Sequence, residues 1–398
     1  MKSTRLFFLV AAWLAVVVAA RADLASIIAE VESNSPSQAT AIPRRASIIF
    51  IQCHGLGHGD LSCYGQTNYQ TPNLDRLAAE GIRFTSYRAG STDFAAAQAA
   101  LVTGKNSTNP STITIAQRLQ QAGYHTGLLG EWALGPTPWT QGFDEFAGFV
   151  QPDEGRNYFA DYLWRYAPES ILNTTNNQLE TFTGKEMLYP NTGGKNGEYL
   201  PEVFTKMTVN FIHTHQPDRF NHYQPFFLLV DLPAPRSASA TADEFPVPTD
   251  APFSDEPWPA AAKNRAALIT RLDTGIGRLL EELQKLQMTN NVAIFFTSAS
   301  GAENFVDPKL KTLWPADEVA AGAPRVPMIV RWPGNIPAGR VSRQNWSAVD
   351  FAPTALQIGY VKPAADFTGI SVLPVLLGQA GTITNVPPDR LDRPIHGF

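Results

Sequence analysis

The chain has 398 residues, 44% of them hydrophobic and 17% charged, and its formal net charge at pH 7 is -5. This length allows one large α/β domain with a small appendage, and the composition is that of a packed globular protein, which excludes an intrinsically disordered chain. The mild acidity and the lack of a basic patch argue against a nucleic acid as partner.

The first 22 residues have the pattern of a secretory signal peptide. Lys2 and Arg5 precede an apolar run over 6–20, and a small-x-small cleavage site ends at Ala22. A membrane span needs roughly 20 apolar residues, so this run is short for a retained anchor helix, which is the alternative. We therefore expect residues 1–22 to be removed and the protein to be exported to the periplasm or the extracellular space, with no transmembrane segment in the mature chain.

Residues 23–45 are polar and irregular, and they are predicted to form a linker or N-terminal arm ahead of one α/β domain over 46–398. The two cysteines of the chain are Cys53, at the end of a predicted buried strand, and Cys63, in the loop that follows. Export permits a disulfide between them. Independent, buried thiols are nevertheless the expected state.

From residue 46 onward, strand-like and helix-like segments alternate. Short apolar runs typical of buried strands lie at 47–52, 126–129, 226–232, 291–297 and 326–331. Helical patterns lie at 72–80, 95–102, 112–122, 200–213, 260–286 and 348–358. The stretch 152–195 is rich in Asn, Thr, Tyr and Gly and is predicted to be a long surface excursion. The alternation predicts an open, mainly parallel sheet with helices on both faces.

Several of these segments carry motifs. They include SIIFIQCHGLGHGDLSCYG at 47–65, TPNLDRLAAEGIRF at 71–84, STDFAAAQAALVTGK at 91–105, GYHTGLLGEWALG at 123–135 and GFDEFAGF at 142–149. In this order they resemble the sulfatase family of the alkaline phosphatase superfamily, and the similarity covers most of 47–394. The resemblance implies an α/β/α sandwich with a mainly parallel central sheet, and a C-terminal subdomain that is largely absent from this chain.

The resemblance also implies where a metal would bind. Active members hold a hard cation, commonly calcium, with oxygen ligands. An Asp pair that supplies part of this set is matched here by His54 and Gly55, and a later Asp-Asn pair is matched by Ala299 and Ser300. Because these positions offer no carboxylate, we expect no calcium cofactor and no metal ligands.

The catalytic motifs of the family are replaced as well. Its C-x-P-x-R motif, whose Cys or Ser becomes formylglycine, is matched by a segment that begins at Phe94 and ends at Gln98, so no oxygen can be activated there. The family's GKWHLG, which binds the sulfate, is matched by Glu131 at its Lys and Ala133 at its His. Arg236 stands where a His of an A-P-H motif acts on the leaving group. The resemblance thus predicts no catalytic residues.

Two of these substituted residues are expected to interact. Glu131 and Arg236 match positions that both face the sulfate, and we predict a salt bridge between them at about 4 Å. His54 is expected to be a hydrogen-bonded residue at a strand end, with a role as replacement metal ligand as the alternative. His58 lies in a glycine-rich loop and is expected to be solvent-exposed.

Three histidines, His213, His215 and His222, cluster near the end of a predicted helix with a spacing that hints at metal binding. No carboxylate or Cys partner completes the set in the sequence. A polar surface turn is therefore the expected structure.

Together these observations predict an exported protein of sulfatase fold that does not hydrolyse sulfate esters. A sulfated glycan or a protein is its expected partner, and the sequence does not choose between them. The alternative is an active sulfuric or phosphoric ester hydrolase with reassigned residues, namely His54, Glu131, Arg236 and Ser300. A truncated gene product in decay is a third interpretation.

Overall fold

The computed structural model describes residues 45–106, 109, 112–151, 154–173, 178–216, 224–239, 244–302, 305, 307–314, 319–320, 323–363 and 365–379. The predicted signal peptide and all of the predicted arm except Arg45 lie outside these residues. Among the described helices, none combines the length and the apolar character that a membrane crossing requires.

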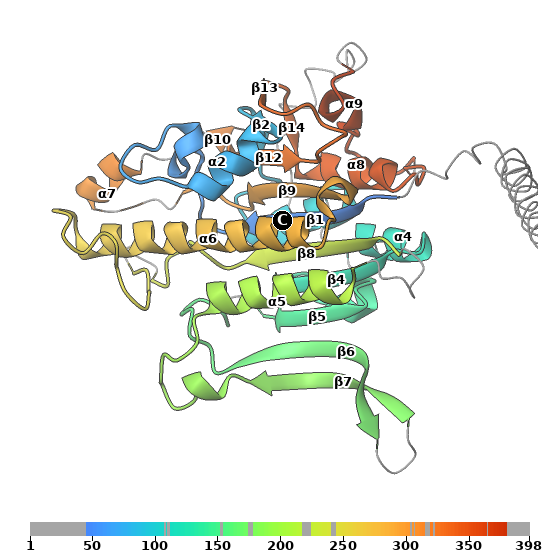
Figure 1. Ribbon diagram of the computed structural model, residues 1–398, viewed down its shortest axis with the longest axis horizontal. Coiled ribbons are helices and arrows are strands. Elements are labelled where there is room, and N and C mark those ends of the chain that lie inside the picture. The colour runs from blue at the N-terminus through green and yellow to red at the C-terminus, as the bar shows by residue number, and fades with distance from the viewer. Residues whose placement is uncertain are drawn as a thin grey trace, which may run out of the picture. The chain divides into compact units, whose positions relative to one another are not determined.

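A ten-stranded sheet with the order β13-β2-β12-β9-β1-β8-β4-β5-β6-β7 forms the centre of the fold (Figure 1). Its middle consists of five parallel neighbours, β9 (Val292–Ser298), β1 (Ser47–Cys53), β8 (Phe226–Leu232), β4 (His125–Glu131) and β5 (Glu145–Phe149). Every residue of β1, β8 and β9 is buried, as expected of strands that are covered on both faces.

Strands of both directions extend the sheet on its two sides. On one side lie β12 (Met328–Arg331), which is antiparallel to its neighbours, and then β2 (Ile82–Phe84) and β13 (Arg340–Ser342), which pair in parallel with each other. On the other side lies the antiparallel hairpin of β6 (Tyr162–Asn173) and β7 (Gln178–Met187), in which β6 is antiparallel to β5. The predicted surface excursion over 152–195 thus contains a regular edge hairpin, whose strands the composition did not predict. An edge hairpin has little apolar surface to bury, so its composition resembles that of a loop.

The remaining elements are short. Two small sheets pair β10 (Val319–Ala320) with β11 (Ala323–Pro324) and β14 (Trp346–Ser347) with β3 (Tyr87–Arg88). Single turns of 3-10 helix are η1 (His58–Asp60), η2 (Ser62–Tyr64), η3 (Pro138–Gln141), η4 (Tyr189–Asn191), η5 (Thr289–Asn291) and η6 (Ala348–Asp350). The short helices are α7 (Pro308–Leu313) and α9 (Leu373–Leu376).

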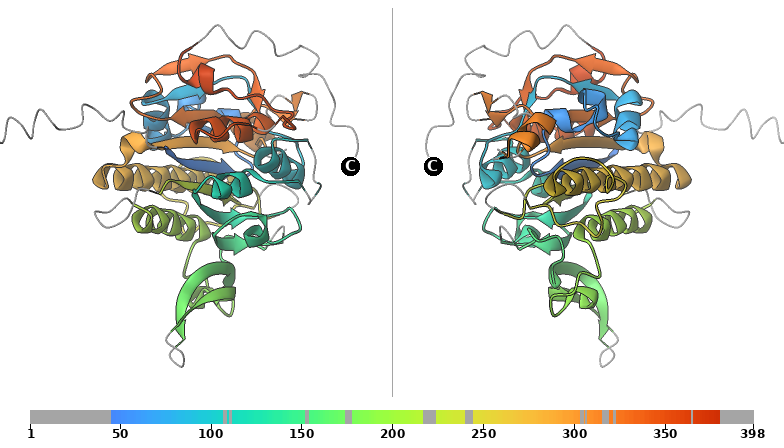
Figure 2. Two further views of the ribbon diagram at one scale, coloured as in Figure 1. Left: turned by 90° about the vertical axis from the view of Figure 1, so that its right-hand side faces the viewer. Right: turned by 90° about the vertical axis from the view of Figure 1, so that its left-hand side faces the viewer.

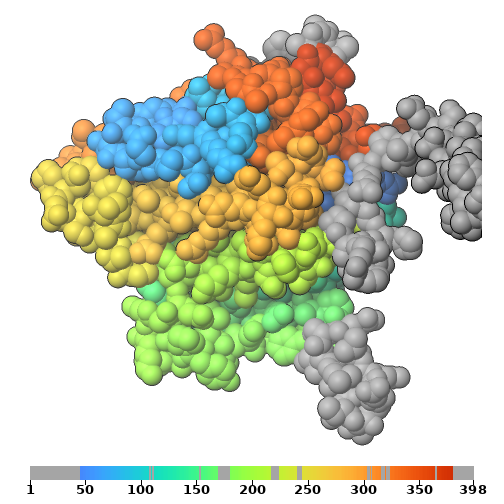
Figure 3. All heavy atoms as spheres, viewed as in Figure 1, coloured from blue at the N-terminus to red at the C-terminus, as the bar shows by residue number. Residues whose placement is uncertain are grey.

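Longer helices cover both faces of the sheet (Figure 2). One layer contains α2 (Pro72–Ala79), α5 (Leu200–Thr214) and α6 (Ala260–Lys285), and the other contains α3 (Phe94–Thr103), α4 (Ile115–Gln121) and α8 (Phe351–Ile358). In the space-filling view, atoms of α2, α6 and α5 cover the middle of the sheet on this face (Figure 3).

The alternation of side chains along a strand explains how the two helix layers share one sheet. Ile49 and Ile51 of β1 pack in the core with α2, α5 and α6, whereas Ile48 and Phe50 pack in the core with α3, α4 and α8. The expected α/β/α sandwich with a mainly parallel central sheet is thereby confirmed.

Candidate functional site

The substituted motif positions meet at one edge of the sheet. His54 and Gly55 follow β1, Ala299 and Ser300 follow β9, and Glu131 is the last residue of β4. Arg236 and Ala133 come shortly after β8 and β4, so that all of these positions lie at the carboxyl ends of four neighbouring parallel strands. This edge is where open α/β sheets bind their ligands.

Helix α3 places Phe94 and Gln98 beside the same edge. The Asp93 carboxylate accepts a hydrogen bond from the backbone N–H of Ala96 at 2.8 Å, which begins the helix at Phe94. The Phe94 ring lies against the imidazole of His54, with 4.0 Å between the ring centroids. Gln98 follows one turn later and is fully buried.

A glycine fixes the position of Glu131. Gly130 has a φ of 119°, and a Cβ atom at this residue would lie 1.7 Å from the backbone oxygen of Asp231. Only glycine therefore permits the close approach of β4 and β8 at this point. The next residue, Glu131, is thereby held beside the end of β8.

A chain of charged side chains crosses the site. The Nε2 atom of His54 lies 2.6 Å from Oδ1 of Asp231, and its Nδ1 atom lies 3.3 Å from Oε2 of Glu131. The other oxygen of Glu131 accepts a hydrogen bond from Arg236 at 3.0 Å, which is the salt bridge predicted from the sequence. The imidazole of His54 thus lies between two buried carboxylates, and the guanidinium of Arg236 pairs with one of them.

Asp231 was not identified from the sequence, yet it contacts His54 and two buried amide side chains. Its second oxygen, Oδ2, accepts hydrogen bonds from the amides of Gln52 at 3.0 Å and Gln98 at 2.7 Å. The backbone N–H of Ala133 donates to Oε1 of Gln98 at 2.8 Å, which fixes the orientation of that amide. The available signal was a single carboxylate inside the otherwise apolar strand β8.

The residues that follow β9 form hydrogen bonds with the backbone of β1 and of the loop after it. The Ser300 hydroxyl accepts a hydrogen bond from the backbone N–H of Gly55 at 2.9 Å. The backbone N–H of Ala299 donates to the carbonyl of Cys53 at 2.7 Å. These contacts join the loops that follow β1 and β9, and they leave the Ser300 oxygen occupied as an acceptor.

The loop after β1 is held in place by a buried ion pair between Arg265 and Asp60. A guanidinium nitrogen of Arg265, on α6, donates to the Gly55 carbonyl at 2.8 Å and to Asp60 at 2.9 Å. Arg265 also lies over the Trp314 ring, with 4.9 Å to the centroid. Asp60 also accepts a hydrogen bond from the backbone N–H of Gly57, which fixes the turn at the end of this loop.

The donor set of this site does not fit a calcium ion. Calcium requires about six to eight oxygen ligands at about 2.3–2.6 Å. Here the carboxylate of Asp231 is surrounded by N–H donors, and the other matching positions supply an imidazole, a methyl group and a hydroxyl. The guanidinium of Arg236, which lies 3.0 Å from Glu131, would repel a cation placed beside that carboxylate.

His58 differs from its prediction. It is partly buried rather than exposed, and its ring meets that of Tyr64 edge to face with 4.4 Å between centroids. Burial, together with the positive charges of Arg325 and Arg83, lowers the pKa of His58 to about 4. Its imidazole is therefore neutral at pH 7.

Both cysteines are free thiols in the structure. Burial, reinforced by Asp75, raises the pKa of Cys63 to about 12, and burial also raises the pKa of Cys53. Both thiols are therefore protonated at neutral pH and are poor nucleophiles.

The three predicted clustered histidines do not stay together. His213 lies 3.2 Å from Glu282 on α6, whereas His215 contacts Glu145, and His222 lies outside the described residues. The expectation that no carboxylate partner exists is wrong for both His213 and His215, because α6 and β5 supply one each from distant parts of the sequence. Although burial raises it, hydrogen bonds from His125 and His215 lower the pKa of Glu145 to about 2.

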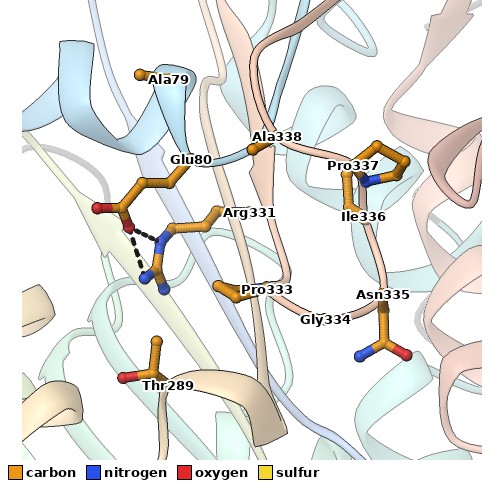
Figure 4. A pocket seen from close by; sticks show the side chains of 10 residues that line it. All are labelled: Ala79, Glu80, Thr289, Arg331, Pro333, Gly334, Asn335, Ile336, Pro337 and Ala338. Carbon is orange, nitrogen blue, oxygen red and sulfur yellow. Dashed lines mark hydrogen bonds and ion pairs between the residues drawn. The ribbon is translucent and has the colours of Figure 1, made fainter.

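A cavity of about 560 Å³ lies away from the substituted positions (Figure 4). It is lined by the end of α2 and the loop after β12, and Arg331 donates to Glu80 across it at 2.7 Å. Arg331 pairs with Ile294 near the amino end of β9, so this cavity opens at the opposite edge of the sheet.

The chain is similar to known proteins over most of its length. Residues 46–359 match the family model described as Sulfatase. N-acetylgalactosamine-6-sulfatase of Canis lupus familiaris is 28% identical over 385 residues, which cover 88% of this chain and 69% of that protein. Human arylsulfatase A is 27% identical over 378 residues, covering 85% and 69%. The crystal structure of Ps i-CgsB in complex with k-i-k-neocarrahexaose superimposes with a TM-score of 0.65 at 25% identity, covering 84% of this chain and 77% of that one.

Proposed function

Since the chain belongs to the sulfatase family, we propose that it is an exported member that binds its partner without hydrolysing sulfate esters. The observation that carries this proposal is the set of side-chain contacts that links Arg236, Glu131, His54 and Asp231. It occupies the edge of the sheet where the catalytic motifs of the family were matched. The polar groups of this edge interact with one another, which removes the demand for a cation or a sulfate.

The residue at the nucleophile position supports the same conclusion. Covalent catalysis requires an oxygen or sulfur atom that an adjacent group can activate. Phe94 has neither, and its ring packs on the imidazole of His54 instead. The aromatic side chain thus blocks the approach to His54 from α3.

Anion binding at this edge is opposed by an energetic argument. Arg236 is the one cation there that reaches solvent, with 15% of its side chain exposed, and it is engaged by the buried Glu131. A sulfate that recruited Arg236 would leave the Glu131 carboxylate without this partner. Breaking a buried ion pair in this way costs about 3–5 kcal/mol. That penalty exceeds what one exposed charge pair with sulfate returns, which is about 0–1 kcal/mol.

The reassigned-hydrolase alternative has one observation in its favour. His54 is held by Asp231 at 2.6 Å, as a histidine base is oriented by a carboxylate in many hydrolases. However, its second nitrogen faces Glu131 at 3.3 Å, so carboxylates of the protein, rather than a hydroxyl nucleophile, occupy both ring nitrogens. Ser300, the hydroxyl in this reading, is bound to the Gly55 backbone.

The partner is proposed by analogy with the relatives. One is named for a sulfated N-acetylgalactosamine substrate, and the Ps i-CgsB structure holds k-i-k-neocarrahexaose. We propose a sulfated glycan as the partner, bound by loops around the filled edge. Binding of the purified protein to an array of sulfated glycans tests this proposal. If the protein binds none of the glycans, a protein partner is favoured instead.

The activity test uses the mature chain with sulfate and phosphate esters, namely 4-nitrophenyl sulfate, 4-nitrophenyl phosphate and N-acetylgalactosamine 6-sulfate, each with and without added calcium. We expect no turnover above buffer. Turnover that is lost in His54→Ala or Glu131→Gln would refute the proposal. Glu186→Gln is the matched control, because Glu186 forms an exposed pair with Arg165 on the β6–β7 hairpin.

Export rests on the signal-peptide pattern of residues 1–22. We expect the secreted product to begin at or near Asp23, which N-terminal sequencing of the protein after export measures directly. Recovery of the uncleaved chain from the membrane fraction would instead favour a retained anchor helix.

A further inference from the structure

A second cluster of ionisable side chains lies at the opposite edge of the sheet from His54. His125 and Glu145 are the first residues of β4 and β5, and His215 directly follows α5. Oε1 of Glu145 lies 3.0 Å from Nε2 of His125 and 3.2 Å from Nε2 of His215. The two imidazole rings stack at 25° with 4.1 Å between their centroids.

The fold holds these residues together from three separate elements. β4 and β5 pair in parallel with Gly127 opposite Glu145, which brings the amino ends of the two strands side by side. A Cβ atom at Gly127 would lie 2.5 Å from the Phe211 ring, so glycine allows α5 to approach β4 closely. His215 lies one turn beyond Phe211 and is thus directed toward the strands.

The donor atoms suit a first-row divalent cation. One ligand atom from each of His125, Glu145 and His215 can be chosen so that all lie within 4.8 Å of one another. Zinc binds imidazole nitrogen and carboxylate oxygen at about 2.0–2.2 Å, which places ligand atoms about 3.2–3.6 Å apart in tetrahedral geometry. Small side-chain rotations would reach that arrangement. Two imidazoles with one carboxylate also match zinc-type cations better than calcium or magnesium.

An outer hydrogen bond orients one of the rings for this role. Nδ1 of His215 donates to the Phe211 carbonyl at 2.8 Å, so Nε2 is the nitrogen that faces the cluster. Metal-bound histidines usually donate their other N–H to a carbonyl or carboxylate in this way. Oε1 of Glu145 lies 3.0 and 3.2 Å from the two Nε2 atoms, so the three donor atoms already converge on one point.

We propose that His125, Glu145 and His215 bind a zinc-type divalent cation. Its remaining coordination positions are filled by water, because all three side chains are partly exposed. The ion joins the end of α5 to the amino ends of β4 and β5 and has a structural role. This site is independent of the proposed function, since it shares no residue with the edge that contains His54.

The test measures zinc binding by calorimetry on the full mature chain, purified with a removable tag that lacks histidine and dialysed against EDTA. We expect one equivalent of zinc with a dissociation constant in the micromolar range or below, and an intense visible absorption of the cobalt-substituted protein. His215→Gln and Glu145→Gln should each weaken zinc binding at least about tenfold.

His213→Gln is the matched control. His213 lies on the same helix two residues earlier but contacts Glu282 instead, so its variant should bind zinc as the wild type does. Equal loss of affinity in the His213 and His215 variants would overturn the proposal, as would a wild-type chain that takes up no stoichiometric zinc.

A measurement without variants covers the case in which they do not fold. Carbethoxylation of the wild-type chain, read by mass spectrometry of peptides, should be blocked by zinc at His125 and His215 but not at His213. Modification of all three at the same rate with and without zinc would contradict the site.

Discussion

Glu131 and Asp231 are buried carboxylates, and each lies within hydrogen-bonding distance of cations or N–H donors from the protein itself. A buried charge is tolerated when it is paired, and it becomes strongly destabilising when its partner is removed. The two residues therefore couple the stability of this edge to His54 and Arg236. The contribution of each residue to the free energy of unfolding can be measured with single substitutions.

Glu131→Gln should lower the free energy of unfolding by about 3 kcal/mol, because it leaves both His54 and Arg236 without their shared carboxylate. Arg236→Gln should be comparably destabilising. In the double variant the losses should not add, with a coupling of about 1–3 kcal/mol. Urea denaturation provides the values. Strict additivity would mean that the two side chains do not interact in solution.

His58 makes the stability of the protein depend on pH. Its pKa is about 4 in the folded state, compared with about 6.5 for an unperturbed histidine. The unfolded chain therefore binds more protons between these values, so the stabilisation is fully present above about pH 6.5 and is lost as the pH falls toward 4. Between pH 7 and pH 4.5, the wild type should lose about 2 kcal/mol more than His58→Gln. Parallel pH profiles of the two proteins would contradict the assignment.

Part of the site could be predicted from residues, and part could not. The substituted positions, including the Glu131–Arg236 pair, followed from motifs that stand close to strand ends. Asp231 was missed because its partners, Gln52, His54 and Gln98, lie more than 130 residues away in the sequence. The carboxylate beside His215 was missed for the same reason, because Glu145 precedes that histidine by 70 residues.

At the scale of elements, the junction of β4 and β8 is set by a backbone contact. Gly130→Ala would place its Cβ 1.7 Å from the Asp231 backbone oxygen, so we expect a loss of more than about 3 kcal/mol in unfolding free energy. Gly123→Ala is the matched control: its φ is also positive, at 87°, but nothing lies within 4 Å of the new Cβ. The control should lose only about 1–2 kcal/mol. Similar losses of unfolding free energy in the two variants would show that the positive φ causes the destabilisation, rather than the contact of the new Cβ with the Asp231 backbone.

Buried strands and helices were predicted more accurately than elements at the exposed edge of the sheet. The strand 226–232 is apolar except for Asp231 and was predicted with its observed bounds, and the long helix 260–286 was predicted to within one residue. The hairpin over 162–187 fell within the predicted surface excursion and its strands were not predicted, because an edge hairpin shows neither a continuous apolar run nor a clear helical period. Strand order was also beyond the sequence, since it depends on contacts between distant segments.

At the scale of the whole molecule, the two edges of one sheet differ in chemistry. The carboxyl edge places His54 between Asp231 and Glu131 and pairs Arg236 with Glu131. The amino edge presents two imidazoles that share one carboxylate oxygen. One sheet positions both sets of side chains.

The most direct test of the central claim is the melting temperature of the mature chain in increasing calcium and in increasing sulfate. A ligand at one hundred times its dissociation constant stabilises a folded protein by about 2.7 kcal/mol, which raises the melting temperature by several degrees. If the charges at the carboxyl edge are satisfied internally, millimolar calcium or sulfate should shift the melting temperature by less than about 1 °C. A saturable rise in the wild type that disappears in Asp231→Asn would contradict the account.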